Sequence, residues 1–211
     1  MEAQFWQDKW QKNEIGFHEP DVNPLLVEHI SALALEPGDR IFLPLCGKTL
    51  DIAWLLSQGY RVVGVELVEL AIEQLFAELE LEPDISRAGT LLCYQAPGID
   101  IYVGDLFDLS VDELGTVDAV YDRAAFVALP PEMRASYAKK MTEVTHSADQ
   151  LLITFEYDQS LMSGPPFSST HSDVENSYQP AYQLTLLSEG EMPGGLKGHP
   201  ADEFVWLLRQ E

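Results

Sequence analysis

A turn and a carboxylate that follow two successive predicted strands are the first features of this chain that suggest a ligand. The turn is Leu45-Cys46-Gly47, and the carboxylate belongs to Glu66, nineteen residues after Gly47. An acid about 20 residues past a turn glycine is placed to accept hydrogen bonds from the two hydroxyls of a ribose. Glu66 could also simply end a strand, but the turn before it favours the ribose interpretation.

The residues after this turn do not complete a phosphate-binding motif. Gly47-Lys48-Thr49 resembles the end of a triphosphate loop, but that motif needs a glycine five positions earlier, where the chain has Phe42. The three-glycine dinucleotide fingerprint is absent as well, which leaves a pyrophosphate with poor access to the helix terminus. A ribose-binding acid without a pyrophosphate-binding turn favours a nucleoside cofactor, and S-adenosylmethionine is the common one.

Arg123 is the candidate cation, because it directly follows a predicted strand. A buried arginine is costly unless it is paired. Arg123 therefore either pairs with an acid such as Asp122, or it holds an electron-rich acceptor or the carboxylate of the cofactor. The histidines show no metal-ligand spacing, and Cys46 has no base that the sequence places beside it. We expect neither a metal site nor a cysteine nucleophile.

Aromatic residues near the N-terminus form a second candidate feature. Trp6 and Trp10 are four residues apart and share one face of a predicted helix over residues 5–12. Such a pair is usually part of a core, although an aromatic face can also attract a sulfonium cation. Phe17 and His18 follow in a loop.

The elements that position these residues alternate along the chain. Apolar runs predict strands over residues 41–45, 61–66, 99–103, 117–121 and 151–155. Periodic segments predict helices over residues 50–57, 69–81 and 131–145. Residues 182–187 and 203–208 suggest two closing antiparallel strands, and residues 168–172 suggest a loop. This order predicts an α/β fold with a mostly parallel, seven-stranded sheet and helices on both faces.

The composition limits the classes of partner. The chain has 211 residues, with 12 Lys plus Arg against 35 Asp plus Glu and a formal net charge of −23. A broad nucleic-acid-binding face and an anionic membrane surface are therefore disfavoured. Two cysteines, no signal peptide and no membrane-length apolar run predict a cytoplasmic protein, and we expect a monomer.

Several motifs occur together and in order. They are Trp6 with Trp10, Gly16-Phe17-His18, Leu43-Pro44-Leu45-Cys46-Gly47-Lys48-Thr49, Gly64-Val65-Glu66-Leu67, Tyr121-Asp122-Arg123-Ala124-Ala125 and Gly164-Pro165-Pro166-Phe167. In this combination the chain resembles the thiopurine S-methyltransferase family, from about Phe5 to Phe167. The tail beyond Phe167 is shorter and more polar than is typical of that family.

The resemblance implies a Rossmann-like class I methyltransferase fold and an enzyme that transfers methyl from S-adenosylmethionine to small aromatic or heterocyclic thiols. Some bacterial members are linked to selenium or tellurium methylation. The residues implied to contact the cofactor are Trp10, Leu45, Glu66, Asp105, Leu106 and Arg123. Phe17 is implied to line the acceptor pocket, and Arg123 is the one residue that we expect to act in catalysis. Trp6 is expected to pack in the core.

We expect a single domain over residues 1–211, with a helical lid over 1–35 and a Rossmann-like core over 36–211. Two other hypotheses remain open. A nicotinamide-dependent oxidoreductase would share the sheet and the ribose acid, although the single-glycine turn disfavours it. A non-catalytic module would keep the fold and bind cofactor without transferring the methyl group.

Overall fold

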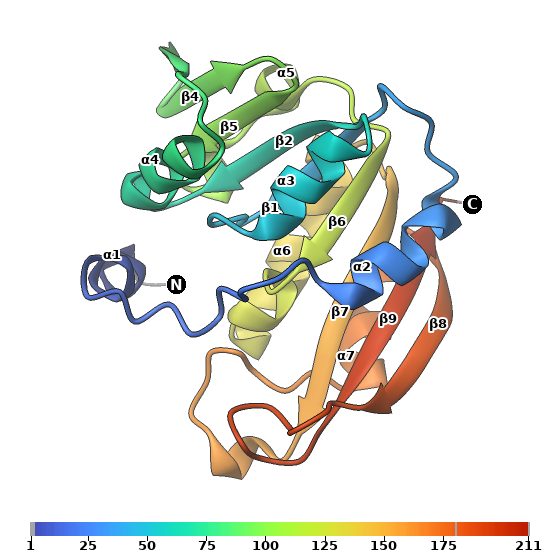
Figure 1. Ribbon diagram of the computed structural model, residues 1–211. Helices are drawn as coiled ribbons and strands as arrows, with labels where there is room; N and C mark the ends of the chain where they lie inside the picture. Colours follow the sequence, from blue (N-terminus) through green and yellow to red (C-terminus); the bar gives the residue numbers. More distant parts are fainter. Residues whose placement is uncertain (1–2, 180, 211) are drawn as a thin grey trace. The chain divides into compact units, whose positions relative to one another are not determined.

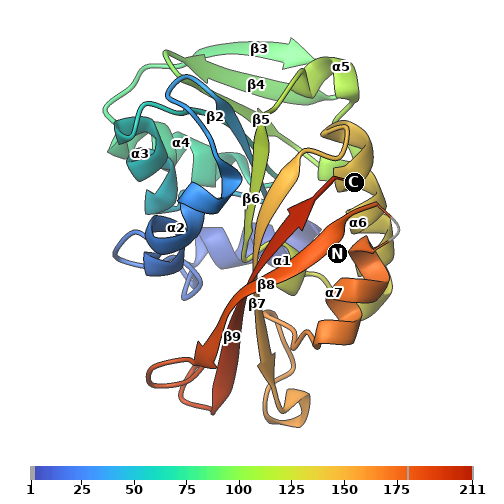
Figure 2. The ribbon, with the colours of Figure 1, turned by 90° about the vertical axis from the view of Figure 1, so that its right-hand side faces the viewer.

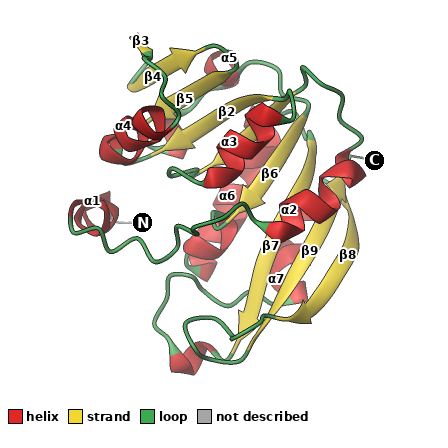
Figure 3. Ribbon diagram, in the orientation of Figure 1, coloured by secondary structure: helices red, strands yellow, loops and turns green. Residues whose placement is uncertain are grey.

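The computed structural model describes residues 3–179 and 181–210. The chain forms two compact units, Met1–Asp118 and Ala119–Glu211. Each unit contains a run of hydrogen-bonded strands accompanied by helices, as the colouring by secondary structure shows (Figure 3). Within the described residues, we find no helix that combines the length and the apolar character needed to cross a bilayer.

The first unit begins with helices and then alternates strands with helices. Its helices are α1 (Ala3–Gln11), α2 (Pro24–His29), η1 (Ile30–Leu33), α3 (Leu50–Ser57), α4 (Glu69–Glu78), η2 (Leu106–Asp108) and α5 (Val111–Leu114). Its strands are β1 (Arg40–Pro44), β2 (Arg61–Glu66), β3 (Asp84–Ala88), β4 (Leu91–Ala96) and β5 (Ile99–Val103).

The strands of the first unit lie in the order β3-β4-β5-β2-β1. β1, β2 and β5 are parallel, because α3 returns the chain to the start of β2 and a longer connection returns it to β5 (Figure 1). Residues 41–44 and 62–66 are buried without a break, as is typical of parallel strands that are covered on both faces. The carboxyl ends of these three strands therefore meet at one edge.

The segment before α2 is held to the start of α3 by a buried acid. Asp51 Oδ1 accepts the backbone N–H of Asn23 at 2.8 Å. The Asn23 side chain in turn caps α2 by accepting the amides of Leu25 and Leu26. Asp51 therefore supports local structure, as its position in the first turn of a helix suggests.

The second unit places its helices beside a smaller group of strands. Its elements are β6 (Ala119–Arg123), η3 (Phe126–Ala128), α6 (Pro131–Val144), β7 (Asp149–Tyr157), η4 (Gln159–Leu161), α7 (His171–Tyr178), β8 (Gln183–Glu191) and β9 (Ala201–Arg209). The strand order is β6-β7-β9-β8, in which β6 and β7 are parallel and β9 pairs antiparallel with both of its neighbours. Figure 2 shows α6 and α7 side by side on one side of these strands. The predicted antiparallel pair at the C-terminus is confirmed.

Two sequence-based predictions were wrong. The described residues contain nine strands and not seven, because β3 and β4 form an additional antiparallel hairpin. β3 is exposed along most of its length and lacks the apolar face by which a strand is recognised in a sequence. The polar segment predicted as a loop begins α7 at His171, where Thr170 and Asp173 form a reciprocal capping box.

Candidate active site

The turn after β1 has an unusual backbone. Leu45 has φ of +47°, in the left-handed region that bulky residues rarely adopt, and Gly47 has φ of +52°. Such a conformation persists only where the surrounding structure holds it, and these conformations cluster at binding sites. Leu45 is half-buried here, and the turn leads directly into α3.

Glu66, the last residue of β2, holds two neighbouring turns with its carboxylate. Oε2 accepts the backbone N–H of Gly47 at 2.9 Å, and Oε1 accepts that of Val68 at 2.9 Å. The side chain is buried, and burial raises the pKa of this carboxyl, while backbone hydrogen bonds from Val68, Gly47 and Leu67 act in the opposite direction. The carboxylate therefore joins the turn after β1 to the start of α4.

The carboxylate of Glu66 has more acceptor sites than its backbone donors occupy. An ionised carboxyl offers about four lone-pair sites, and the donors here are the amides of Gly47, Val68 and Leu67. The remaining acceptor capacity suits hydroxyl donors, such as the vicinal hydroxyls of a ribose. The donors and acceptors at the carboxyl end of β2 therefore fit a nucleoside cofactor.

Trp10 packs against the same turn from α1. It is buried with Val68 and Ala71, and a Cβ placed on Gly47 would lie only 3.2 Å from Trp10 Cζ2. Phe17 contacts Trp10 edge to face, with ring centroids 5.7 Å apart. Trp10 and Phe17 are therefore gathered around the start of α4.

Trp6 joins this aromatic group at its margin. Its ring also meets Phe17 edge to face, at 5.5 Å, and the side chain is only partly buried. Trp6 thus packs against the small core that Trp10 occupies, in agreement with the packing role expected for it.

Asp105 and Leu106 follow β5, the third parallel strand. The amide of Gly104 donates to the Glu66 carbonyl oxygen at 2.9 Å, which holds the ends of β5 and β2 together. Asp105 is exposed and caps η2 by accepting the Phe107 amide at 2.9 Å, whereas Leu106 is buried. The first unit thus brings six of the predicted site residues to neighbouring elements: Trp10, Phe17, Leu45, Glu66, Asp105 and Leu106.

Arg123 belongs to the second unit and ends β6. Its side chain is half-buried, and the next residue, Ala124, has φ of +63°. Asp122 is fully buried and accepts the Tyr137 hydroxyl at 2.6 Å and the Phe126 amide at 3.1 Å. No sequence signal marks Tyr137 as a site residue, since nothing in the helical pattern around it shows that it faces a carboxylate.

Cys46 is held as a neutral thiol. Burial, together with the nearby Glu66 carboxylate, raises the pKa of Cys46 well above its ordinary value. A Cβ on Gly64 would lie 2.8 Å from Cys46 Sγ, so the glycine in β2 makes room for the sulfur. Among the described residues, no three His, Cys, Asp or Glu side chains are grouped so that they could hold a metal ion.

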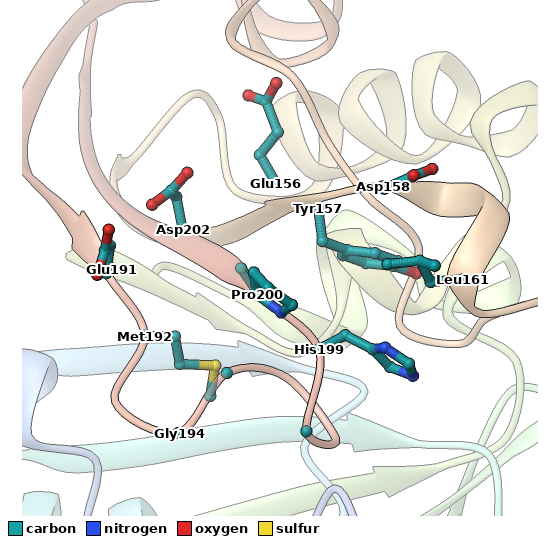
Figure 4. Close-up of a pocket in the computed structure, with 13 residues that line it drawn as sticks. Glu156, Tyr157, Asp158, Leu161, Glu191, Met192, Gly194, His199, Pro200 and Asp202 are labelled. Carbon is teal, nitrogen blue, oxygen red and sulfur yellow. The ribbon is translucent and has the colours of Figure 1, made fainter.

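The second unit also contains an open pocket of about 930 Å³ between the end of β7 and the β8–β9 connection (Figure 4). Glu156 lies opposite Asp202 in the strand register, and Asp202 lies opposite Glu191, so three carboxyl groups form a row across β7, β9 and β8. Figure 4 shows all three side chains pointing to the same side. Asp158 adds a fourth acid, and the described lining residues include no Lys or Arg. The pocket therefore repels anions.

Comparison with known proteins identifies a family that the sequence of this chain matches. The family model for thiopurine S-methyltransferase matches residues 1–201. A thiopurine S-methyltransferase of Teredinibacter turnerae is 52% identical over 209 residues, which cover 99% of this chain and 97% of the relative. A protein of the same name from Xanthobacter autotrophicus is 50% identical and aligned over the full length of both chains.

A solved structure supports the fold independently. The Burkholderia thailandensis 1,6-didemethyltoxoflavin-N1-methyltransferase, solved with bound S-adenosylhomocysteine, superimposes with a TM-score of 0.68 at 14% identity. The match covers 99% of this chain and 87% of that protein. The expected Rossmann-like class I methyltransferase fold is therefore confirmed. From its full-length relatives and the family model, the chain belongs to the thiopurine S-methyltransferase family.

Proposed function

We propose that the protein transfers a methyl group from S-adenosylmethionine to the sulfur of small aromatic or heterocyclic thiols. The observation that carries the proposal is the Glu66 carboxylate, which is buried at the end of β2 with acceptor sites for a ribose. The names of the full-length relatives favour thiopurines among such thiols.

The residues of the first unit would hold the cofactor. Glu66 would accept the two ribose hydroxyls, and Asp105 and Leu106 would lie beside the adenine. Leu45 and Trp10 would contact the rest of the molecule, with the aromatic face of Trp10 favouring positive charge. Bound S-adenosylmethionine supplies an electrophilic methyl group on a sulfonium cation.

The protein contributes mainly position to such a reaction. An aromatic thiol ionises readily, so a strong base is not needed, and orientation alone can supply roughly 7–11 kcal/mol of a barrier. Arg123 would hold the electron-rich acceptor or the carboxylate of the cofactor. Phe17 would form a wall of the acceptor pocket, and the aromatic group with Trp10 would exclude water.

We further infer that residues 1–211 act as one methyltransferase domain, with residues 1–35 as a lid, and that the protein is a monomer in the cytoplasm. Light scattering after size exclusion measures the mass directly. A species near 23.6 kDa supports the monomer, whereas a particle of twice that mass contradicts it.

Calorimetric titration with S-adenosylmethionine, followed by a methyl-transfer assay with a thiopurine, tests the function. Saturable binding and a methylated sulfur product are expected. A folded sample that binds no S-adenosylmethionine at millimolar concentration contradicts the proposal. Binding of NAD in its place favours the oxidoreductase. Binding without transfer to any thiol in a panel favours the non-catalytic module.

Replacing Arg123 tests its part in that function. Arg123→Ala should lower turnover with a thiol acceptor by at least tenfold. Unchanged affinity for S-adenosylmethionine in this variant assigns Arg123 to the acceptor, and weakened affinity assigns it to the carboxylate of the cofactor. The charge-conserving Arg123→Lys variant separates loss of charge from loss of the planar, two-pronged donor. Wild-type turnover in a folded Arg123→Ala protein would remove this residue from the site.

A further inference from the structure

The end of β6 sends two charged side chains in different directions. Successive residues of a strand point to opposite faces, so Asp122 and Arg123 leave the backbone on opposite sides. Asp122 is fully buried, whereas Arg123 is half-buried. Contacts that fix the position of Asp122 therefore also fix the backbone from which the Arg123 side chain extends.

The Asp122 carboxylate is held by contacts from two directions. Tyr137, a fully buried residue of α6, donates its hydroxyl to Oδ2 at 2.6 Å. The amide of Phe126 donates to Oδ1 at 3.1 Å. A buried carboxylate without such donors would be strongly unfavourable, so these contacts determine where this part of β6 can lie.

The backbone between Asp122 and Phe126 is strained. Ala124 has φ of +63°, which brings its Cβ close to the following carbonyl oxygen and is unusual for alanine. The strain sits directly after Arg123 and two residues before the Phe126 amide that Asp122 holds. The hydrogen bond from Phe126 to Asp122 therefore closes a short loop around the strained residue.

Phe126, at the far end of this loop, is itself fixed by its surroundings. Its ring is fully buried, with the Tyr178 ring at 5.7 Å and the Arg134 guanidinium 5.0 Å from its centroid. Arg134 also donates to the carbonyl oxygen of Ser168 at 2.9 Å. The loop from Asp122 to Phe126 is thus anchored at both ends.

We propose that Asp122 is a positioning residue for Arg123: the carboxylate, held by Tyr137, closes the strained turn at Ala124 and so sets the direction of the Arg123 side chain. The inference rests on the proposed function, in which Arg123 touches the acceptor or the cofactor. In this proposal Asp122, whose carboxylate is fully buried, acts through Arg123 and does not itself contact either molecule.

A double-mutant cycle measures this coupling. Asp122→Ala should lower kcat/KM at least tenfold in the wild-type background, and the effect should disappear when Arg123 is already alanine. Asp122→Asn should retain activity within about threefold, since its amide can bond both Tyr137 and Phe126. Equal effects of Asp122→Ala in both backgrounds would show that Asp122 acts independently of Arg123 and would overturn the inference.

Two tyrosine variants provide a milder test in case Asp122→Ala does not fold. Tyr137→Phe removes the donor to Asp122 and should lower kcat/KM only when Arg123 is present. Tyr182→Phe is the matched control, because this buried tyrosine bonds Gln150 instead. Equal kinetic effects of the two variants would contradict the proposal.

A spectroscopic measurement separates the inference from the proposed function. In nitrogen-15 NMR spectra, the Arg123 Nε–H signal should be sharp in wild type and Asp122→Asn, and broadened or shifted in Asp122→Ala or Tyr137→Phe. An unchanged Arg123 signal in these folded variants overturns the positioning role. If the wild type transfers no methyl group, the proposed function fails, while this spectrum still decides the inference.

Discussion

The carboxylate of Glu66, at the end of β2, accepts the amide of Gly47, in the turn after β1, at 2.9 Å, although the two residues are nineteen positions apart. Its other oxygen holds the amide of Val68. The residue proposed to bind the ribose therefore also holds the turn after β1 and the start of α4. Any substitution of Glu66 will change both stability and cofactor affinity, and these effects need to be separated.

We expect Glu66→Gln to separate them. Glutamine keeps one acceptor oxygen but loses the charge and turns an NH2 donor toward the other backbone amide, so affinity for S-adenosylmethionine should fall at least tenfold and the free energy of unfolding by about 1–3 kcal/mol. Glu66→Ala leaves two amides without this acceptor and should lower the free energy of unfolding by about 1–3 kcal/mol for each. Calorimetry and urea denaturation measure the two quantities. A folded Glu66→Gln protein with wild-type affinity would exclude the ribose contact.

Gly47→Ala should destabilise the protein by about 1–2 kcal/mol. The added Cβ would lie 3.2 Å from Trp10 Cζ2, and φ at this position is +52°. Gly16→Ala is the matched control, since nothing lies within 4 Å of its Cβ and its φ is not positive. Thermal unfolding of the two variants compares them, and equal melting temperatures would show that the turn tolerates alanine.

Asp122 should make stability depend on pH. Burial raises the pKa of Asp122 from 3.8 to about 6. The folded protein therefore binds this proton more tightly than the unfolded chain, so the contribution of Asp122 to stability is greatest below pH 3.8 and is lost as the pH rises through 6. Over that full span the change is on the order of 3 kcal/mol, since one pKa unit corresponds to about 1.4 kcal/mol.

Comparison with Asp122→Asn isolates this contribution, because other titrating groups are common to both proteins. The stability of wild type relative to the variant should fall between pH 4 and pH 6, as measured by denaturant unfolding at each pH. Tyr137 and Tyr178, which face the carboxyl, stay neutral throughout because burial raises the pKa of each far above this range. A constant difference across the range would contradict the raised pKa of Asp122.

The row of acids in the second unit should be unfavourable at low salt. Glu156 and Glu191 both lie opposite Asp202, and like charges that face each other across strands repel. Asp202→Asn should therefore raise stability by about 0.5 kcal/mol at low ionic strength, with a smaller gain in 1 M salt. Glu175→Gln removes the same charge from the exposed face of α7 and serves as control. An equal gain in both variants would assign the effect to net charge alone.

The sequence is more informative about strand ends than about contacts between distant segments. The spacing from Gly47 to Glu66 predicted a ribose-binding acid after the second strand, and its carboxylate lies beside the turn because adjacent parallel strands place their carboxyl ends together. The hydrogen bonds that Glu66 accepts from the amides of Gly47 and Val68 were not predicted, since every residue except proline has a backbone N–H and the sequence does not show which of them will meet a carboxylate. The bond between Asp122 and Tyr137 was missed for a related reason: the helical pattern of α6 does not show which residue it meets.

The errors in the fold have different causes. The hairpin of β3 and β4 was missed because β3 is largely exposed and lacks an apolar pattern. The start of α7 was recoverable, because Thr170 followed three residues later by Asp173 is the spacing of a capping box. The polar composition of that segment led to the prediction of a loop, although the residues that cap a helix are themselves polar.

The environment of Cys46 has a consequence for chemical self-protection. A protein that binds an alkylating sulfonium must avoid methylating its own nucleophiles, and Cys46 stands directly after Leu45 in the proposed cofactor site. Only the thiolate is a strong nucleophile, and burial beside the Glu66 carboxylate keeps this sulfur protonated. The acid proposed to bind the ribose thereby also disfavours ionisation of the neighbouring thiol, which leaves the acceptor's sulfur as the more reactive target.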